Sequence, residues 1–267
     1  MNIFFAVLVA LSSVLPKVAT AQEPSLDVEA YHRAVDFCRK QSWPGFTLAP
    51  DKHILCFGAT IPDHLDLSEA RELRQDGLFV IRSRGGDSGS AIALAEIVRD
   101  RHATVVVYDH CLSACASFLL ISSHSAYVVK GTLVAWHNFI GEGLCTHLVQ
   151  QGSGPKKLER GPCKTDLTIT ASDDYRPNWT KLFSYLSERT VDPSYRNPPD
   201  SPYVRNIVTN TYTDTGVYRD VMWTLHPRRY PSWFKTKIYY EAYPENQEEV
   251  DDMARRVPIS PRVIYDP

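Results

Sequence analysis

The sequence predicts an α/β domain with a largely parallel β-sheet. Two observations support this prediction. Short apolar runs typical of buried strands alternate with amphipathic stretches typical of helices, and 43% of the 267 residues are apolar, enough to form a full core. This length fits one domain with appendages. The 29 basic and 31 acidic side chains nearly balance, so the composition favours neither a nucleic acid nor an anionic membrane as a partner.

The elements of the first half follow from periodicity. Apolar residues three and four positions apart predict helices, and uninterrupted apolar runs predict buried strands. In chain order, the predicted elements are helix 26–41, strand 53–61, helix 67–75, strand 78–82, helix 88–101, strand 103–108, helix 113–121, strand 126–129 and strand 133–137. Strand 78–82 ends at the turn Ser83-Arg-Gly-Gly86.

The second half of the chain is less regular. Residues 141–171 contain glycine, lysine and two cysteines, which predicts a disulfide-stapled surface insertion. Residues 173–188 predict a helix with Pro177 in its first turn. Residues 233–267 are aromatic and charged, and we expect them to form an irregular extension packed on the domain.

The N-terminus has the pattern of a secretory signal peptide. Residues 3–15 are an apolar stretch too short to span a bilayer comfortably. Val18-Ala-Thr-Ala21 is a small-x-small cleavage pattern, and no lipobox cysteine stands near it. We therefore expect residues 1–21 to be removed. The mature protein is expected to be periplasmic or secreted, with no membrane attachment after cleavage.

All six cysteines lie in the mature part of the chain, which agrees with export. They are Cys38, Cys56, Cys111, Cys115, Cys145 and Cys163. Six cysteines allow 15 connectivities. Pairing of neighbours (38–56, 111–115 and 145–163) is the simplest, because short loops close easily. Zinc binding is the alternative, but the sequence has one CxxxC and no CxxC, and we expect no metal and no cofactor.

The stretch Cys111-Leu-Ser-Ala-Cys115 places one hydroxyl where a strand changes into a helix. A serine becomes a nucleophile when a base takes its proton and donors receive the oxyanion. Backbone N–H groups without partners at the helix start favour this role for Ser113. Ala114 N–H is one candidate donor, and the Gly85-Gly86 turn is the source of a second. The alternative role for Ser113 is a helix N-cap.

His137 is the candidate base. It ends strand 133–137, the usual place for an active group in an α/β sheet. A structural histidine in the core or at the sheet edge is the alternative. Lys130, the lysine within the core segment, gives a Ser–Lys dyad as a further possibility.

Residues 82–90 (RSRGGDSGS) contain two misleading patterns. The sequence GDSG also surrounds the nucleophile of chymotrypsin-like proteases, but that fold is an all-β double barrel with an upstream Ala-His-Cys. Here a strand leads into a helix. A phosphate-binding loop would need a Walker lysine or GxGxxG, and neither is present.

Three motifs occur in a fixed order over residues 53–138. They are Ser-x-Gly-Gly between a strand and a helix, C-x-S-A-C at the start of an apolar helix, and a strand-ending histidine, His137, 24 positions after Ser113. This order resembles the Clp protease proteolytic subunit and its secreted or periplasmic relatives in the ClpP/crotonase superfamily. The resemblance implies a ββα spiral for residues 22–232 and a serine hydrolase, with a peptide or protein as substrate. By analogy with such relatives, a homo-oligomer is expected.

The resemblance also assigns roles within the site. It implies Ser113 as nucleophile and His137 as general base, with the N–H groups of Gly86 and Ala114 forming the oxyanion hole. A strand-like edge at Asp87–Ser90 would hold an extended peptide by β-augmentation. The two flanking cysteines would lock the turn in an oxidising compartment, or stay as two buried thiols.

A third member, an acidic residue that orients the histidine, is implied far along the chain. The local pattern Arg219-Asp220-Val-Met-Trp-Thr-Leu-His-Pro227 makes Asp220 the first choice. Asp173, Asp174 and Asp214 remain alternatives.

The chain departs from the family pattern at one position of the first motif. The family usually has Ser-Pro-Gly-Gly, and Arg84 replaces the proline here. This change removes rigidity and adds a cation beside the proposed groove, which favours acidic ligands. The alternative function is a non-catalytic binding or assembly protein that keeps the fold without a working triad. A carboxylate within hydrogen-bond reach of His137 would distinguish the two.

Overall fold

The computed structural model describes most of the chain after its N-terminus. The described residues are 26–41, 44–137, 144–149, 157–162, 176–192, 195, 221–259 and 262–267. No helix within these ranges is long and apolar enough to cross a membrane. The predicted signal peptide, residues 1–21, lies outside them.

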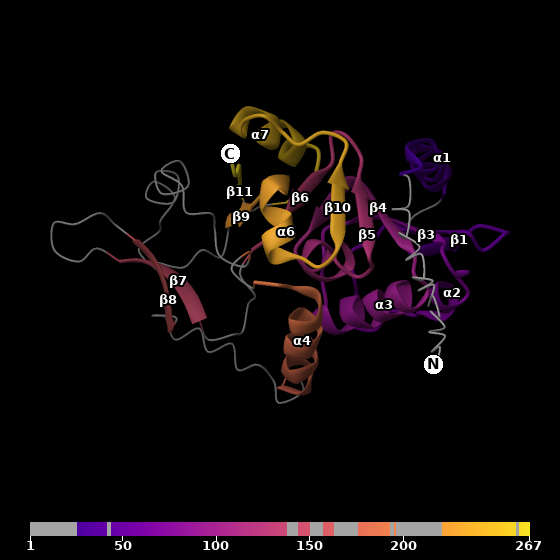
Figure 1. The fold of residues 1–267 in the computed structure, drawn as a ribbon, viewed down its shortest axis with the longest axis horizontal. Helices are drawn as coiled ribbons and strands as arrows, with labels where there is room; N and C mark the ends of the chain where they lie inside the picture. Colours follow the sequence, from indigo (N-terminus) through magenta and orange to yellow (C-terminus); the bar gives the residue numbers. More distant parts are fainter. Residues whose placement is uncertain are drawn as a thin grey trace, which may run out of the picture.

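A seven-stranded, mostly parallel sheet forms the centre of the fold (Figure 1). Its strands are β1 (Phe46–Leu48), β2 (Ile54–Phe57), β3 (Leu78–Ser83), β4 (Thr104–Leu112), β5 (Ser125–Val128), β6 (Leu133–Ala135) and β10 (Lys237–Tyr240). They follow the order β1-β2-β3-β4-β5-β10, and β6 also pairs with β4. β1 is antiparallel to β2, and the other pairings in this sheet are parallel. The α/β class with a largely parallel sheet is confirmed.

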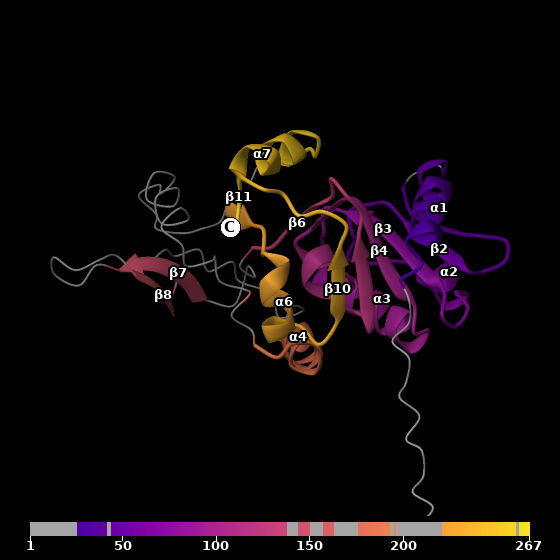
Figure 2. The same ribbon diagram turned by 45° about the horizontal axis from the view of Figure 1, so that its top comes forward.

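Helices cover both faces of this sheet (Figure 2). One face carries α1 (Val28–Arg39). The other face carries α3 (Ser88–Asp100), the π-helical turn η1 (Cys115–Leu119) and α4 (Arg176–Arg189). The fold is therefore a three-layer arrangement in which the central sheet is covered on both sides.

Alternate residues of strand β4 pack into two hydrophobic clusters, one on each face of the sheet. Val105 and Val107 pack with the residues of α3 and η1, whereas Val106 and Tyr108 pack with those of α1. Successive side chains of a strand point to opposite faces, so a strand buried on both faces is apolar throughout.

Several predicted boundaries are wrong. The strand predicted over 53–61 is β2, which ends at Phe57, and the helix predicted over 113–121 is reduced to η1. Two further differences have local reasons. β4 runs to Leu112 instead of ending at residue 108. Its register against β3 shifts, and Asp109, with φ 57°, adopts a left-handed conformation in this irregular stretch, a conformation that aspartate tolerates. The helix predicted over 67–75 is reduced to α2 (Ser68–Arg71), because the Arg74 N–H donates to the Lys52 carbonyl (2.9 Å) instead of continuing the helix.

The C-terminal part is regular structure, so the expected irregular extension over 233–267 is wrong. β10 pairs in parallel with β5 along four residues, and Ile238 and Tyr240 pack against the main core. The remaining elements of this part are β9 (Val221–Trp223), η4 (Pro227–Arg229), α6 (Tyr230–Trp233), α7 (Gln247–Arg255) and β11 (Arg262–Ile264). The last quarter of the chain thus completes the central sheet.

In the insertion predicted over 141–171, the structure describes two strands. β7 (Leu144–Val149) and β8 (Lys157–Pro162) pair antiparallel in a two-stranded sheet of their own. Cys163 lies outside the described residues, so the predicted pairing of Cys145 with Cys163 stays a prediction.

Two disulfides join neighbouring cysteines, as predicted. Cys38–Cys56 links α1 to β2 across a sequence separation of 18, and Cys111–Cys115 spans a separation of 4. In the chain-entropy description, the longer loop contributes about 3 kcal/mol to stability and the shorter about 2 kcal/mol. Disulfides of this kind are typical of proteins that fold in an oxidising compartment.

Candidate active site

Ser113 and His137 are in direct contact. Ser113 Oγ and His137 Nε2 lie 2.6 Å apart, and both residues are partly buried. Ser113 follows β4, and His137 comes two residues after the end of β6. These strands are parallel neighbours, so their carboxyl ends meet at the same edge. Since η1 has no side-chain cap, the N-cap role for Ser113 is not the one observed.

The backbone of Ser113 is held in an unusual conformation. Its φ is 57°, in the left-handed region, which costs a residue with a side chain about 1–2 kcal/mol. Its N–H donates to the Ala135 carbonyl (3.0 Å), two residues before His137. The turn Cys111–Cys115, called the serine turn below, is therefore hydrogen-bonded to the strand that precedes His137. A strained turn from strand to helix that exposes a serine hydroxyl is typical of nucleophiles.

The Ser-x-Gly-Gly motif forms a loop that packs against this turn. Ser83 Oγ donates to the Ala59 carbonyl (2.6 Å) and accepts the Gly85 N–H (3.1 Å). Gly85 has φ 87°, and a Cβ there would lie 2.7 Å from both Ser113 Cβ and Ala114 N. The loop approaches the serine turn so closely that only glycine fits.

Of the three predicted backbone donors, the N–H groups of Gly86 and Ala114 remain candidates. The Gly85 N–H is occupied by Ser83, so it is not one of them. Ile61 donates its N–H to Gly85 O (2.8 Å) and accepts the Asp87 N–H (2.9 Å). In this parallel bridge the Gly86 N–H faces away from Ile61, and Gly86 is exposed. The Ala114 N–H lies at the start of η1, where N–H groups have no partner within the helix.

Asp87–Ser90 do not form the strand edge expected for peptide binding. Asp87 is the N-cap of α3, and its Oδ1 accepts the Ser90 N–H (2.7 Å). Ser88 begins the helix, and the Asp87 N–H is already bonded to Ile61. A substrate therefore has no open backbone edge at these residues.

Arg84 contacts the C-terminal part of the chain. Its guanidinium donates to the Pro258 carbonyl (2.9 Å) and to Thr60 Oγ1 (3.1 Å). Arg84 thus joins the glycine loop to the segment that follows α7.

The hydrophobic cluster that joins α7 to the strands β4 and β6 was not predicted from the sequence. Val250 and Met253 of α7 and Val257 after it pack in one cluster with Leu112, which precedes Ser113, and Ala135, which lies two residues before His137. The apolar residues at positions 250, 253 and 257 have the spacing of one helix face, so this periodicity could have predicted an amphipathic helix here.

Lys130, the alternative base, is not brought into the site of Ser113 and His137. Lys130 lies exposed in the turn between β5 and β6, where its N–H donates to the Glu241 carboxylate (3.0 Å). Ser113 contacts His137 instead, which is evidence against the Ser–Lys dyad. Asp220 and its alternatives Asp173, Asp174 and Asp214 lie outside the described residues.

We expect His110, also on β4, to make the stability of the protein depend on pH. Burial lowers the pKa of His110 from 6.5, the nearby Asp109 raises it, and Arg82 and Arg84 lower it further. The folded state thus binds fewer protons than the unfolded state just below pH 6.5. This contribution to stability is present above that pH and is lost as the pH falls below it.

We therefore expect the urea midpoint to decrease between pH 7 and pH 5.5, and His110→Gln to flatten this decrease. Burial also lowers the pKa of His226, so part of the slope remains. His64→Gln, at a side chain 96% exposed, is the control that keeps the wild-type slope. Equal slopes in the wild type and His110→Gln would contradict the assignment.

No protein-family model matches the chain, and a comparison with curated proteins finds no match.

Proposed function

We propose that this protein is a serine hydrolase in which Ser113 is the nucleophile and His137 the general base. The observation that supports this is the 2.6 Å contact between Ser113 Oγ and His137 Nε2 at the carboxyl ends of two parallel strands. Nε2 accepts the serine proton while Oγ attacks the substrate carbonyl carbon. His137 then gives this proton to the leaving group, which departs. The acyl group stays on Ser113 Oγ until water hydrolyses it.

The proposed oxyanion hole consists of the N–H groups of Gly86 and Ala114. Both are backbone donors held by the close packing of Gly85 on the serine turn. Such donors stabilise the negative charge that develops on the carbonyl oxygen, and they need no rearrangement during the reaction.

Asp220 is the proposed carboxylate that orients His137. In the sequence it directly precedes β9. Trp223 of β9 is hydrogen-bonded in both directions to Trp136, the residue before His137 (2.9 Å each). This pairing brings β9 beside the histidine-bearing strand and supports Asp220 over its alternatives.

The finer class of the protein is part of the same proposal. The order of motifs supports a ClpP-like spiral, and with it a peptide or protein substrate and a homo-oligomer. The two disulfides support a periplasmic or secreted location after removal of residues 1–21.

The test is to map the site of covalent modification. The oxidised protein is incubated with a fluorophosphonate, digested, and analysed by mass spectrometry, with heat-denatured protein as the control. We expect one adduct, on the peptide that contains Ser113, in the native sample alone. An adduct on another serine would contradict the proposal. No adduct in the native sample would favour the non-catalytic binding protein.

A further inference from the structure

The Cys111–Cys115 disulfide closes a small ring around the candidate nucleophile. The ring contains Leu112, Ser113 and Ala114, and the two cysteine Cα atoms are 5.2 Å apart. The same four peptide units would span about 13 Å if extended. While the bond is intact, the serine turn therefore cannot open.

Ser113 needs such a restraint, because its backbone conformation is disfavoured. Left to itself, a serine with φ 57° relaxes to negative φ. That rotation about the N–Cα bond would swing Cβ and Oγ to a new position. The 2.6 Å contact with His137 Nε2 would then be lost, and with it the path for the proton.

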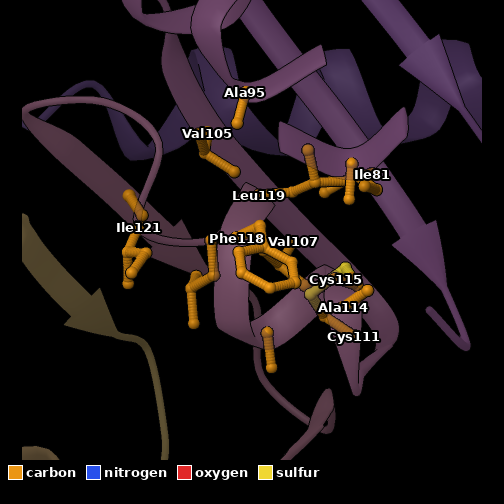
Figure 3. Packing of buried hydrophobic residues seen from close by; sticks show 14 of the residues in the cluster. Ile81, Ala95, Val105, Val107, Cys111, Ala114, Cys115, Phe118, Leu119 and Ile121 are labelled. Carbon is orange, nitrogen blue, oxygen red and sulfur yellow. A yellow bond between two sulfur atoms is a disulfide. The ribbon is translucent and has the colours of Figure 1, made fainter. Parts of the chain in front are cut away.

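The disulfide lies in the hydrophobic core, on the buried side of Ser113. Figure 3 shows the two sulfur atoms inside the core, beside Ala114 and near Phe118. Cys111 and Cys115 are fully buried within the main cluster. Ser113 itself is only partly buried. Neither sulfur is thus placed to meet a substrate, and their effect on a reaction would pass through the serine.

The second disulfide provides a natural contrast. Cys38 and Cys56 are also fully buried, but they pack in the cluster between α1 and the opposite face of the sheet. Their loop is longer and encloses no residue of the candidate site. By chain entropy, Cys38–Cys56 is the larger contributor to stability.

We propose that the Cys111–Cys115 disulfide is a positioning element for Ser113, which it holds in the conformation that meets His137. The inference rests on the proposed function, since it assigns the disulfide to the nucleophile of that reaction. Cys111 and Cys115 are then positioning residues, whereas Cys38 and Cys56 are structural.

The experiment compares two double variants, Cys111→Ala/Cys115→Ala and Cys38→Ala/Cys56→Ala. The first measurement is the second-order rate constant for fluorophosphonate labelling. We expect about a 10²-fold loss in the first variant, as for a misplaced reacting group, and less than about threefold in the second. Thermal melting should rank them the other way, with the lower Tm in Cys38→Ala/Cys56→Ala.

The second measurement does not need activity. The ¹⁵N and ¹H NMR signals of the His137 ring report its contact with Ser113, and Ser113→Ala gives the reference for a lost contact. We expect the signals of Cys111→Ala/Cys115→Ala to move to that reference and those of Cys38→Ala/Cys56→Ala to stay at the wild-type positions. Wild-type signals in Cys111→Ala/Cys115→Ala would overturn the inference.

The two failures are distinguishable. If the wild type is not labelled, the proposed function fails, while the NMR comparison still decides whether the disulfide sets the position of Ser113. Cys111→Val/Cys115→Ala, which refills most of the lost volume without a covalent link, covers poor folding of the first variant. Circular dichroism shows whether these two variants without the Cys111–Cys115 bond are folded. If neither of them folds, the disulfide is needed for the fold as a whole, and the positioning role is wrong.

Discussion

Replacement of Ser113 by alanine is expected to abolish fluorophosphonate labelling and to lower hydrolysis of an activated ester by about 10⁶-fold, the scale of other nucleophile deletions. The variant keeps His137 and the backbone N–H groups but lacks the oxygen that forms the acyl bond. The Ser113 N–H bond to Ala135 involves backbone atoms only, so the turn should persist. The measurement is the initial rate on the ester, with circular dichroism to confirm folding.

Ser123→Ala is the matched control for that experiment. Ser123 lies between η1 and β5 and is almost fully buried, and its Oγ has no hydrogen-bond partner among the described residues. Removing such a hydroxyl costs little. Full activity in Ser123→Ala together with no activity in Ser113→Ala is the expected pair. Labelling of Ser113→Ala at the wild-type level would show that the nucleophile is another residue.

Replacement of Gly85 by alanine is expected to lower the free energy of unfolding by more than about 4 kcal/mol, a large value for one substitution. The new Cβ would lie 2.5 Å from the Leu112 carbonyl oxygen and 2.7 Å from Ala114 N. Both are backbone atoms of the serine turn, and they cannot rotate away as a side chain could. The same clash would separate the glycine loop from the nucleophile, so labelling should fall as well.

Gly131→Ala is the control that separates the cost of the steric clash at Gly85 from the cost of a positive φ. Gly131 has φ 77°, close to the 87° of Gly85, but nothing lies within 4 Å of a Cβ placed there. The cost at Gly131 should be about 1–2 kcal/mol, that of a left-handed residue with a side chain. Urea denaturation of both variants, at constant m-value, gives the comparison. Equal losses at the two positions would show that the loop is looser than the structure indicates.

The parts of the fold that the sequence predicts well are the central strands and the helix α3 that packs on them. β3, α3 and the first residues of β4 are long apolar or strongly periodic segments, and their boundaries agree with the structure within one or two residues. The sheet edge was missed. β10 is half-exposed, with the sequence Lys-Ile-Tyr-Tyr, and it pairs with a strand more than a hundred residues earlier, so its local pattern is weak.

The candidate site divides in the same way. Ser113, His137 and Gly86 could be selected because their motifs stand at the ends of apolar strands. The left-handed conformation of Ser113 could not be selected, because it depends on contacts with Ala135 and Gly85, which are distant in sequence. The occupation of the Gly85 N–H by Ser83 is a local bond, but it depends on the exact conformation of the glycine loop, which composition and periodicity do not give. The peptide edge at Asp87–Ser90 was wrong because a good helix N-cap overrode it.

The placement of β10 sets the order in which the molecule can be completed during synthesis. Ser113 and His137 leave the ribosome early, whereas residues 237–240 emerge near the end. Until they do, β5 presents bare backbone groups, which in a nascent chain invite pairing with another copy.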